Sequence, residues 1–147
     1  MGDNQSQWTR EQYAVIAILT QAEAIEAQVD LLDASRRAQE AAGATFDPKE
    51  LVGYCLAPSS SYRALRPSNG HWLAIVEAQP EALEVCMMSG LMSGSEIEEL
   101  HRGLVSLAKA NSIGELKLQG RKGWQRKLRV HGWKPRGDQL ICEVVNG

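Results

Sequence analysis

The sequence predicts a mixed α/β (α+β) fold, and three patterns support this prediction. The segment from about Trp8 to Ala42 is rich in Ala, Gln and Glu and contains no Gly or Pro, which favours helix. Residues 72–78 and 82–88 have the alternation of two strands joined by a short turn. Residues 115–145 follow the order strand, helix, strand, so a parallel pair is expected somewhere in a mixed sheet.

The N-terminal segment, residues 1–45, is predicted to be one long helix. Apolar residues recur along it at spacings of four and three, and we expect this stripe to face the core: Ile18, Ala22, Ile25, Val29 and Leu32. A charge placed at Ile25 is therefore expected to abolish folding. Apolar residues are denser over 14–19, which leaves open a first strand ahead of the helix.

Residues 46–70 are predicted to form a short helix followed by an irregular loop. Asp47 and Pro48 are a typical helix start, with Asp as the cap and Pro in the first turn. The helix is expected to end near Leu56. The many Pro, Ser and Gly residues of 58–70 predict a loop or a contact arm.

The remaining segment, residues 71–147, contains the predicted core of a single domain that spans residues 1–147. After the hairpin, Ser95 and Glu98 form a capping-box pattern at the start of a helix that runs to about Ala110. A strand over 115–119, a short basic helix over 121–130 and a last strand over 139–145 complete the order.

Composition limits the classes of protein that the chain can represent. At 147 residues and 44 % hydrophobic residues it suits one globular domain. No apolar run approaches the roughly 20 residues of a membrane-spanning helix, so no membrane partner is expected. Residues 1–112 carry a net charge of −7 and residues 113–147 carry +5. This asymmetry suggests head-to-tail packing between subunits or contact with an anion, or a basic solvent-exposed helix face.

The run from Leu116 to Pro135 carries a family resemblance. A strand ends in Gly120-Arg121-Lys122-Gly123-Trp124, then come Leu128 and Gly132-Trp133. This order resembles the closing half of the GNAT acyltransferase fold, and in particular the reduced GNAT-like internal virion and putative acetyltransferase proteins of tailed phages. The resemblance implies a truncated GNAT-like mixed sheet with a long N-terminal helix and a C-terminal strand-helix-strand unit.

The resemblance also indicates where a cofactor would bind. In the family, the pyrophosphate of acyl-CoA lies at the start of the central helix, and Ser93, Gly94 and Ser95 occupy that place here. Backbone N–H groups and the positive end of the helix dipole favour an anion there. However, Glu96, Glu98 and Glu99 put negative charge in the same turn. We therefore expect no cofactor, or acetyl-CoA if the protein is active.

A GNAT-type reaction needs a base for the acceptor amine and an acid for the departing thiolate. Glu77 and Glu84 on the predicted hairpin are the candidate bases, with His71 at its edge. No tyrosine follows Tyr62, so the family's tyrosine acid has no counterpart. The histidines and cysteines have no ligand spacing, and no metal is expected.

A second candidate site is the basic helix near the C-terminus. Its side chains could contact nucleic-acid phosphates, with Trp124 stacking on a base: Arg121, Lys122, Arg126 and Lys127. The alternative is that Trp124 belongs to the core and that the cations are solvent-exposed.

Three functions follow from these observations. The leading expectation, which rests on the resemblance, is a bacteriophage virion-associated structural or morphogenesis protein on a degenerate GNAT scaffold without catalysis. It would form oligomers or bind other virion proteins, in the virion or the host cytoplasm. The alternatives are an acyl-CoA-dependent N-acetyltransferase and a small nucleic-acid-binding accessory protein.

Overall fold

The structure is a computed structural model that describes residues 16–42, 46–68, 70–90, 94–119 and 126–144. Seven strands form one mixed sheet in the order β1-β2-β3-β4-β5-β7-β6. The strands are β1 (Ile16–Ile18), β2 (Tyr62–Pro67), β3 (Trp72–Ala78), β4 (Leu83–Gly90), β5 (Glu115–Gln119), β6 (Lys134–Arg136) and β7 (Gln139–Glu143). The helices are α2 (Gln21–Glu26), α3 (Gln28–Ala42), α4 (Pro48–Leu56), α5 (Gly94–Ala110) and the 3-10 turn η2 (Arg129–His131).

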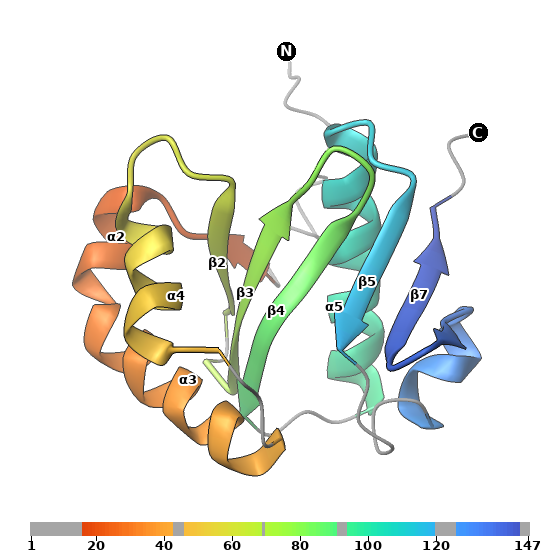
Figure 1. The fold of residues 1–147 in the computed structure, drawn as a ribbon, viewed down its shortest axis with the longest axis horizontal. Helices are drawn as coiled ribbons and strands as arrows, with labels where there is room; N and C mark the ends of the chain where they lie inside the picture. Colours follow the sequence, from red (N-terminus) through yellow and green to blue (C-terminus); the bar gives the residue numbers. More distant parts are fainter. Residues whose placement is uncertain (1–15, 43–45, 69, 91–93, 120–125, 145–147) are drawn as a thin grey trace.

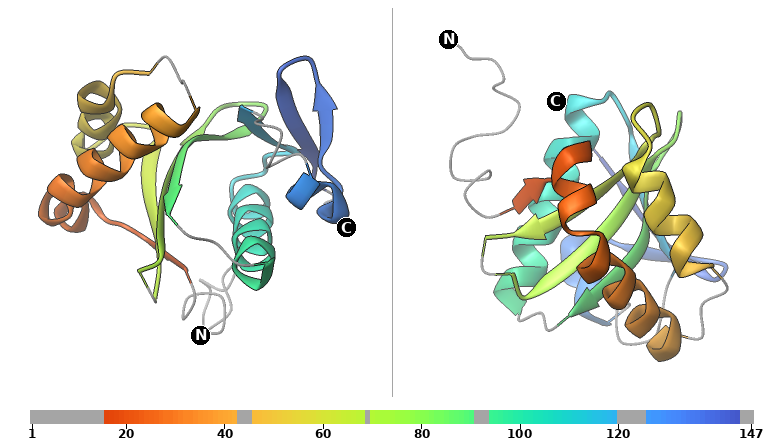
Figure 2. Two further views of the ribbon diagram at one scale, coloured as in Figure 1. Left: turned by 90° about the horizontal axis from the view of Figure 1, so that it is seen from below. Right: turned by 90° about the vertical axis from the view of Figure 1, so that its left-hand side faces the viewer.

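Helices cover both faces of this sheet and divide the core into two layers (Figures 1 and 2). On one face α2, α3 and α4 pack over β2, β3 and β4, around Leu31, Ile75 and Met87. On the other face α5 packs with Ile97, Leu100 and Leu104 against the sheet. Within the described part of the chain, no helix is long and apolar enough to span a membrane.

The sheet does contain a parallel pair, but it lies between β4 and β5 and not within the strand-helix-strand unit of residues 115–145 from which it was expected. Here α5 forms the crossover, whereas β5 and β7 are antiparallel. The hairpin of β3 and β4, α5 and the strands β5 and β7 confirm the predicted elements to within a few residues. The helix begins at Gly94, so Ser95 lies in its first turn and does not cap it. Of the predicted basic helix, residues 126–131 are described as a helical turn that continues into η2.

The N-terminal prediction needs correction. A strand, β1, precedes the helices, so the first-strand alternative is confirmed and one long helix is wrong. The predicted apolar stripe is also wrong, because Ile25 is 44 % and Val29 is 75 % exposed. The residues that face the sheet are instead Leu19, Ala24, Ala27, Leu31 and Ala34. A charge at Ile25 is therefore no longer expected to prevent folding.

The cap of α2 explains this shift. The Thr20 hydroxyl accepts from the Glu23 N–H at 3.1 Å, and the Glu23 carboxylate accepts from the Thr20 N–H at 2.9 Å. This capping box fixes the helix start after β1 and so decides which side meets the sheet. Alanine on that side lets the helix backbone approach closely, a preference that hydrophobic periodicity does not reveal.

Two strands were not expected from the sequence. The predicted loop over 58–70 contains β2, which pairs with both β1 and β3. Arg63, Arg66 and the final Pro67 interrupt the apolar alternation that predicts a strand. Proline is accepted here because it is the last residue of β2. The strand β6 consists of three exposed residues that pair with β7 across a turn at Gly137.

The last residue of β4 is predicted to tolerate only glycine. Gly90 has a φ of 123°, and a Cβ there would lie 2.2 Å from the His71 carbonyl oxygen. Gly90→Ala is expected to lower the free energy of unfolding by about 1–3 kcal/mol or more, measured by chemical denaturation. Gly53→Ala is the matched control, because a Cβ at this helical position meets nothing within 4 Å. The control is expected to stabilise by roughly 0.5–1 kcal/mol. Equal stability of the two variants would contradict the close approach of β4 and β3.

Candidate functional site

The two parallel strands at the centre of the sheet stay paired over only part of their length. Leu83, Glu84 and Val85 of β4 align with Leu116, Lys117 and Leu118 of β5, and the pairing ends there. Beyond Val85, β4 continues to Gly90 while paired with β3 alone. Figure 1 shows the two strands diverging toward their carboxyl ends, with α5 behind them.

An extra residue in β4 accounts for the divergence. Val76 of β3 aligns with Val85 and Ile75 aligns with Met87, so Cys86 has no partner across the pair. Cys86 and Met87 both pack on the α3 side, although neighbours in a regular strand point to opposite faces. Such a bulge bends its strand and increases its twist. Because the bulge follows the last residue paired with β5, it turns β4 away at that point.

The start of α5 lies just beyond the end of β4. Ser93, one of the predicted cofactor residues, lies outside the described residues, whereas Gly94 and Ser95 are exposed in the first turn. A Cβ at Gly94 would meet nothing within 4 Å, so there is unfilled space at this turn. Such space beside helix N–H groups suits an anionic group.

Of the three glutamates near the start of α5, only Glu96 lies in the first turn, and both Glu96 and Glu98 have side-chain partners. Glu96 binds His71 of the β3 edge, with 3.0 Å between its Oε2 and the histidine Nδ1. Glu98 accepts from Arg102 one helical turn later at 2.8 Å, and this bond lowers the pKa of Glu98. Arg102 thus offsets part of the negative charge near the start of α5 that argued against a cofactor.

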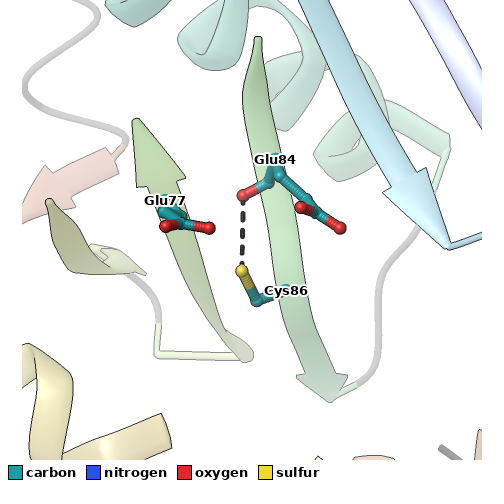
Figure 3. Close-up of side chains that lie close together, drawn as sticks. All are labelled: Glu77, Glu84 and Cys86. Atoms are coloured by element: carbon teal, nitrogen blue, oxygen red, sulfur yellow. Dashed lines mark hydrogen bonds between the residues drawn. The ribbon is translucent and has the colours of Figure 1, made fainter. Parts of the chain in front are cut away.

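The predicted bases Glu77 and Glu84 lie directly opposite each other on β3 and β4. Two like charges in such a pair are unfavourable. The side-chain amide of Gln79, in the hairpin turn, donates to both: 3.0 Å to Glu77 Oε1 and 2.7 Å to Glu84 Oε1. Figure 3 shows the two carboxylates with Cys86 beside them. The sequence identified the pair but not the bridging amide, since Gln79 there indicated only a turn.

The thiol of Cys86 completes this cluster. Its Sγ and one oxygen from each carboxylate lie within 4.8 Å of one another, and the thiol donates to the Glu84 carbonyl oxygen at 3.7 Å. Burial, and then the charges of Glu84 and Glu77, raise the pKa of Cys86 to about 12. A thiol that stays protonated at neutral pH is a poor nucleophile and a poor metal ligand. The cluster therefore favours acid–base chemistry by its carboxylates.

Tyr62 lies opposite Glu77 on the neighbouring strand β2, so Glu84, Glu77 and Tyr62 form a row across three strands. Burial, and then the charge of Glu77, raise its pKa to about 12. Its ring stacks on Tyr54 of α4, with ring centroids 4.7 Å apart. A phenol with a raised pKa, separated from β5 by the two strands β3 and β4, is poorly suited to protonate a leaving group near the divergence.

A separate polar cluster joins α5 to the C-terminal hairpin. The buried Trp133 donates from Nε1 to His101 Nδ1 at 2.9 Å, and His101 stacks on His131 with centroids 5.1 Å apart. Because Nδ1 accepts this bond, His101 is neutral with its proton on Nε2. Burial, and then His131 and Arg102, lower the pKa of His101, while Glu98 opposes this shift. These contacts indicate a structural role for His101.

This bond predicts a specific loss of stability in mild acid. The lowered pKa of His101 means that its contribution is fully present above about pH 6.5 and is lost as pH falls below it. Urea unfolding followed by tryptophan fluorescence is expected to show the decline already between pH 6.5 and 5, above the range of ordinary carboxylates. His101→Gln keeps an acceptor for Trp133 but does not titrate, so its decline is expected to be smaller. An unchanged slope would show that other groups cause it.

The predicted nucleic-acid residues are described only in part. Arg121, Lys122 and the aromatic Trp124 lie outside the described residues. Arg126 and Lys127 are exposed on the turn before η2, while the neighbouring Leu128 is buried in the core beside α5.

Several solved structures resemble this chain in fold. The ribosomal-protein-S18-alanine N-acetyltransferase from Escherichia coli matches at 13 % identity and TM-score 0.62, over 90 % of this chain and 94 % of that chain. A GNAT-family acetyltransferase from Staphylococcus aureus matches at 10 % identity and TM-score 0.63, over 88 % and 99 %. An N-acyl amino acid synthase from uncultured soil microbes matches at 15 % identity and TM-score 0.62, over 88 % and 91 %. No family model and no curated protein sequence matches the chain.

At these identities the likeness establishes the fold, which is mixed α/β and GNAT-like. The resemblance to GNAT proteins is thereby confirmed at the level of fold, without its restriction to phage proteins. The expectation of a virion structural protein is corrected, because the similar structures are acetyltransferases or an acyl amino acid synthase and nothing among them supports a virion role. The expectation failed because it rested on local sequence patterns, which display neither the strand order nor the point where β4 and β5 stop pairing.

Proposed function

We propose that the protein is an acyl-CoA-dependent N-acyltransferase, with acetyl-CoA as its donor. The observation that carries this proposal is the divergence of β4 from β5 after Val85, at the bulge of Cys86. A sheet that opens between two parallel strands offers backbone groups of β4 that no second strand engages. An extended donor molecule can bind along such a strand by hydrogen bonds to its backbone.

The start of α5 supports the same donor. The diphosphate of CoA would lie at Gly94 and Ser95, where helix N–H groups and the helix dipole favour negative charge. From there to Val85, the strand residues 85–90 span about 17 Å at roughly 3.3 Å per residue. An extended pantetheine arm along β4 would bring its thioester toward the closed end of the opening.

The carboxylate pair lies at that closed end. Acyl-CoA supplies the acyl group as an activated thioester. Glu84 precedes the last residue of β4 paired with β5, so we assign it as the base that takes a proton from the acceptor amine. The amine nitrogen then forms a bond to the acyl carbon, the carbon–sulfur bond breaks, and the departing thiolate takes up the proton that Glu84 removed from the amine. Gln79 and Glu77 position the Glu84 carboxylate.

Transfer is proposed to be direct, without an acyl-cysteine. Cys86 is the thiol nearest to the carboxylates, and its pKa of about 12 keeps it protonated at neutral pH. A covalent route would need the thiolate. The acceptor amine therefore attacks the thioester itself.

Donor binding is tested by calorimetric titration with acetyl-CoA. Binding in the micromolar range is expected, and desulfo-CoA should also bind if the diphosphate is recognised at α5. Ser95→Glu adds a second acidic side chain to the first turn, beside Glu96, and is expected to weaken binding at least tenfold. Ser112→Glu, at the opposite end of α5, is the control and should bind as the wild type does. No heat at millimolar acetyl-CoA would overturn the proposal.

The role of Glu84 is tested by acyl transfer from acetyl-CoA to primary amines. The amines include free amino acids and a peptide with an amino-terminal alanine, acceptors suggested by the names of the similar proteins. Glu84→Gln is expected to lower kcat/KM by about 10²–10⁴-fold, as is typical for loss of a general base. Glu77→Gln should cost less, because Glu77 lies one strand farther from β5. A larger loss in Glu77→Gln would reverse the two assignments.

A further inference from the structure

The exposed large apolar side chains of the described residues gather at two places. Val29 is 75 % exposed and Val130 is 80 % exposed, and Ile25 lies one helical turn before Val29. The fourth such residue, Tyr54, already stacks on Tyr62 and donates to Glu50. Isolated exposed apolar residues need no explanation, so the surroundings of the two valines decide whether they matter.

The first place, here called the acidic face, consists of Ile25, Glu26, Val29 and Asp30 on α2 and α3. All four are exposed. Over residues 21–33 the chain has four acidic side chains and no basic one. The ion pairs among the described residues engage neither Glu26 nor Asp30.

The second place, here called the basic face, consists of Arg126, Lys127, Arg129 and Val130 on the turn that leads into η2. These residues are exposed as well. Over residues 126–136 the chain has five basic side chains and no acidic one. Each face thus has an exposed valine among charged side chains, which are acidic on one face and basic on the other.

The faces lie on opposite sides of the molecule. Figure 1 shows α2 at one side of the sheet and the turn before β6 at the other, and Figure 2 shows the same separation. Contact between them within one chain is therefore excluded. Two copies, in contrast, can bring the acidic face of one against the basic face of the next.

We propose that the protein associates with itself head to tail through these two faces. Val29 and Ile25 of one copy would pack against Val130 of the next, and Glu26 and Asp30 would meet Arg126 and Arg129. Opposite potentials guide such an encounter, and the apolar contact supplies affinity that charges alone do not. Because the two faces differ, each copy keeps one face open, and the association yields rings or open chains.

A nucleic acid is the main competing occupant of the basic face. It would explain the cations but not Val130, which offers nothing to a phosphate. It would also leave the exposed Ile25 and Val29 unexplained. A second copy accounts for both faces at once, and for this reason we favour it.

The test is sedimentation velocity of the full chain over a range of concentrations at low and high salt. The wild type is expected to sediment faster as its concentration rises, and less so at high salt. Val29→Asp and Val130→Asp each remove the exposed apolar side chain of one face and put a charge where the two copies would exclude water, so each abolishes the apolar contact. Each variant alone should remain a monomer. Ala41→Asp, also exposed on α3 but outside the acidic face, is the control and should associate like the wild type.

Mixing the two variants distinguishes head-to-tail contact from other modes. Val29→Asp retains an intact basic face and Val130→Asp retains an intact acidic face, so the mixture is expected to give a dimer of one copy of each and nothing larger. A wild-type protein that stays monomeric at low salt would overturn the proposal, as would association that survives in both single variants. Binding of a single-stranded oligonucleotide by a monomeric wild type, lost in Arg129→Glu, would replace it with the nucleic-acid reading.

Discussion

The rest of the structure depends on one extra residue in β4. Up to Val85 the strand is held by β3 on one side and β5 on the other, and after Cys86 it is held by β3 alone. The bulge puts Cys86 and Met87 on the same face, where they join the core beneath α3. The bend of β4 is thus held by apolar packing, which makes the opening between the strands a stable feature of the fold.

The two ends of this opening have opposite chemistry. At the open end, Gly90 lets β4 approach β3 closely, and α5 starts at Gly94, four residues later. At the closed end, two carboxylates face each other and share the amide of Gln79. The arrangement suits an anionic donor that enters at one end and a proton transfer at the other. Its cost is electrostatic, since Glu77 and Glu84 repel each other and Gln79 offsets only part of that repulsion.

The candidate site was partly visible in the sequence. Glu77 and Glu84 were selected because a hairpin with a short turn places such residues near each other, a local relation that the alternation of side chains reveals. The bulge at Cys86 could not be predicted from the sequence, because a bulge is defined by the register of two paired strands. The bond from Trp133 to His101 joins residues 32 positions apart, and no local pattern marks it.

The sequence by itself determined the hairpin of β3 and β4, the helix α5, the strands β5 and β7, and the asymmetry of charge. These depend on neighbours along the chain. Only the tertiary structure decided the strands β1, β2 and β6, the buried side of α2 and α3, and the end of pairing between β4 and β5. Strand pairing and helix burial depend on partners far along the chain, which supply hydrogen bonds and apolar contact that local preference does not encode. The stripe through Ile25 and Val29 shows this most clearly, since its periodicity is real but smaller residues on the other side fit the sheet more closely.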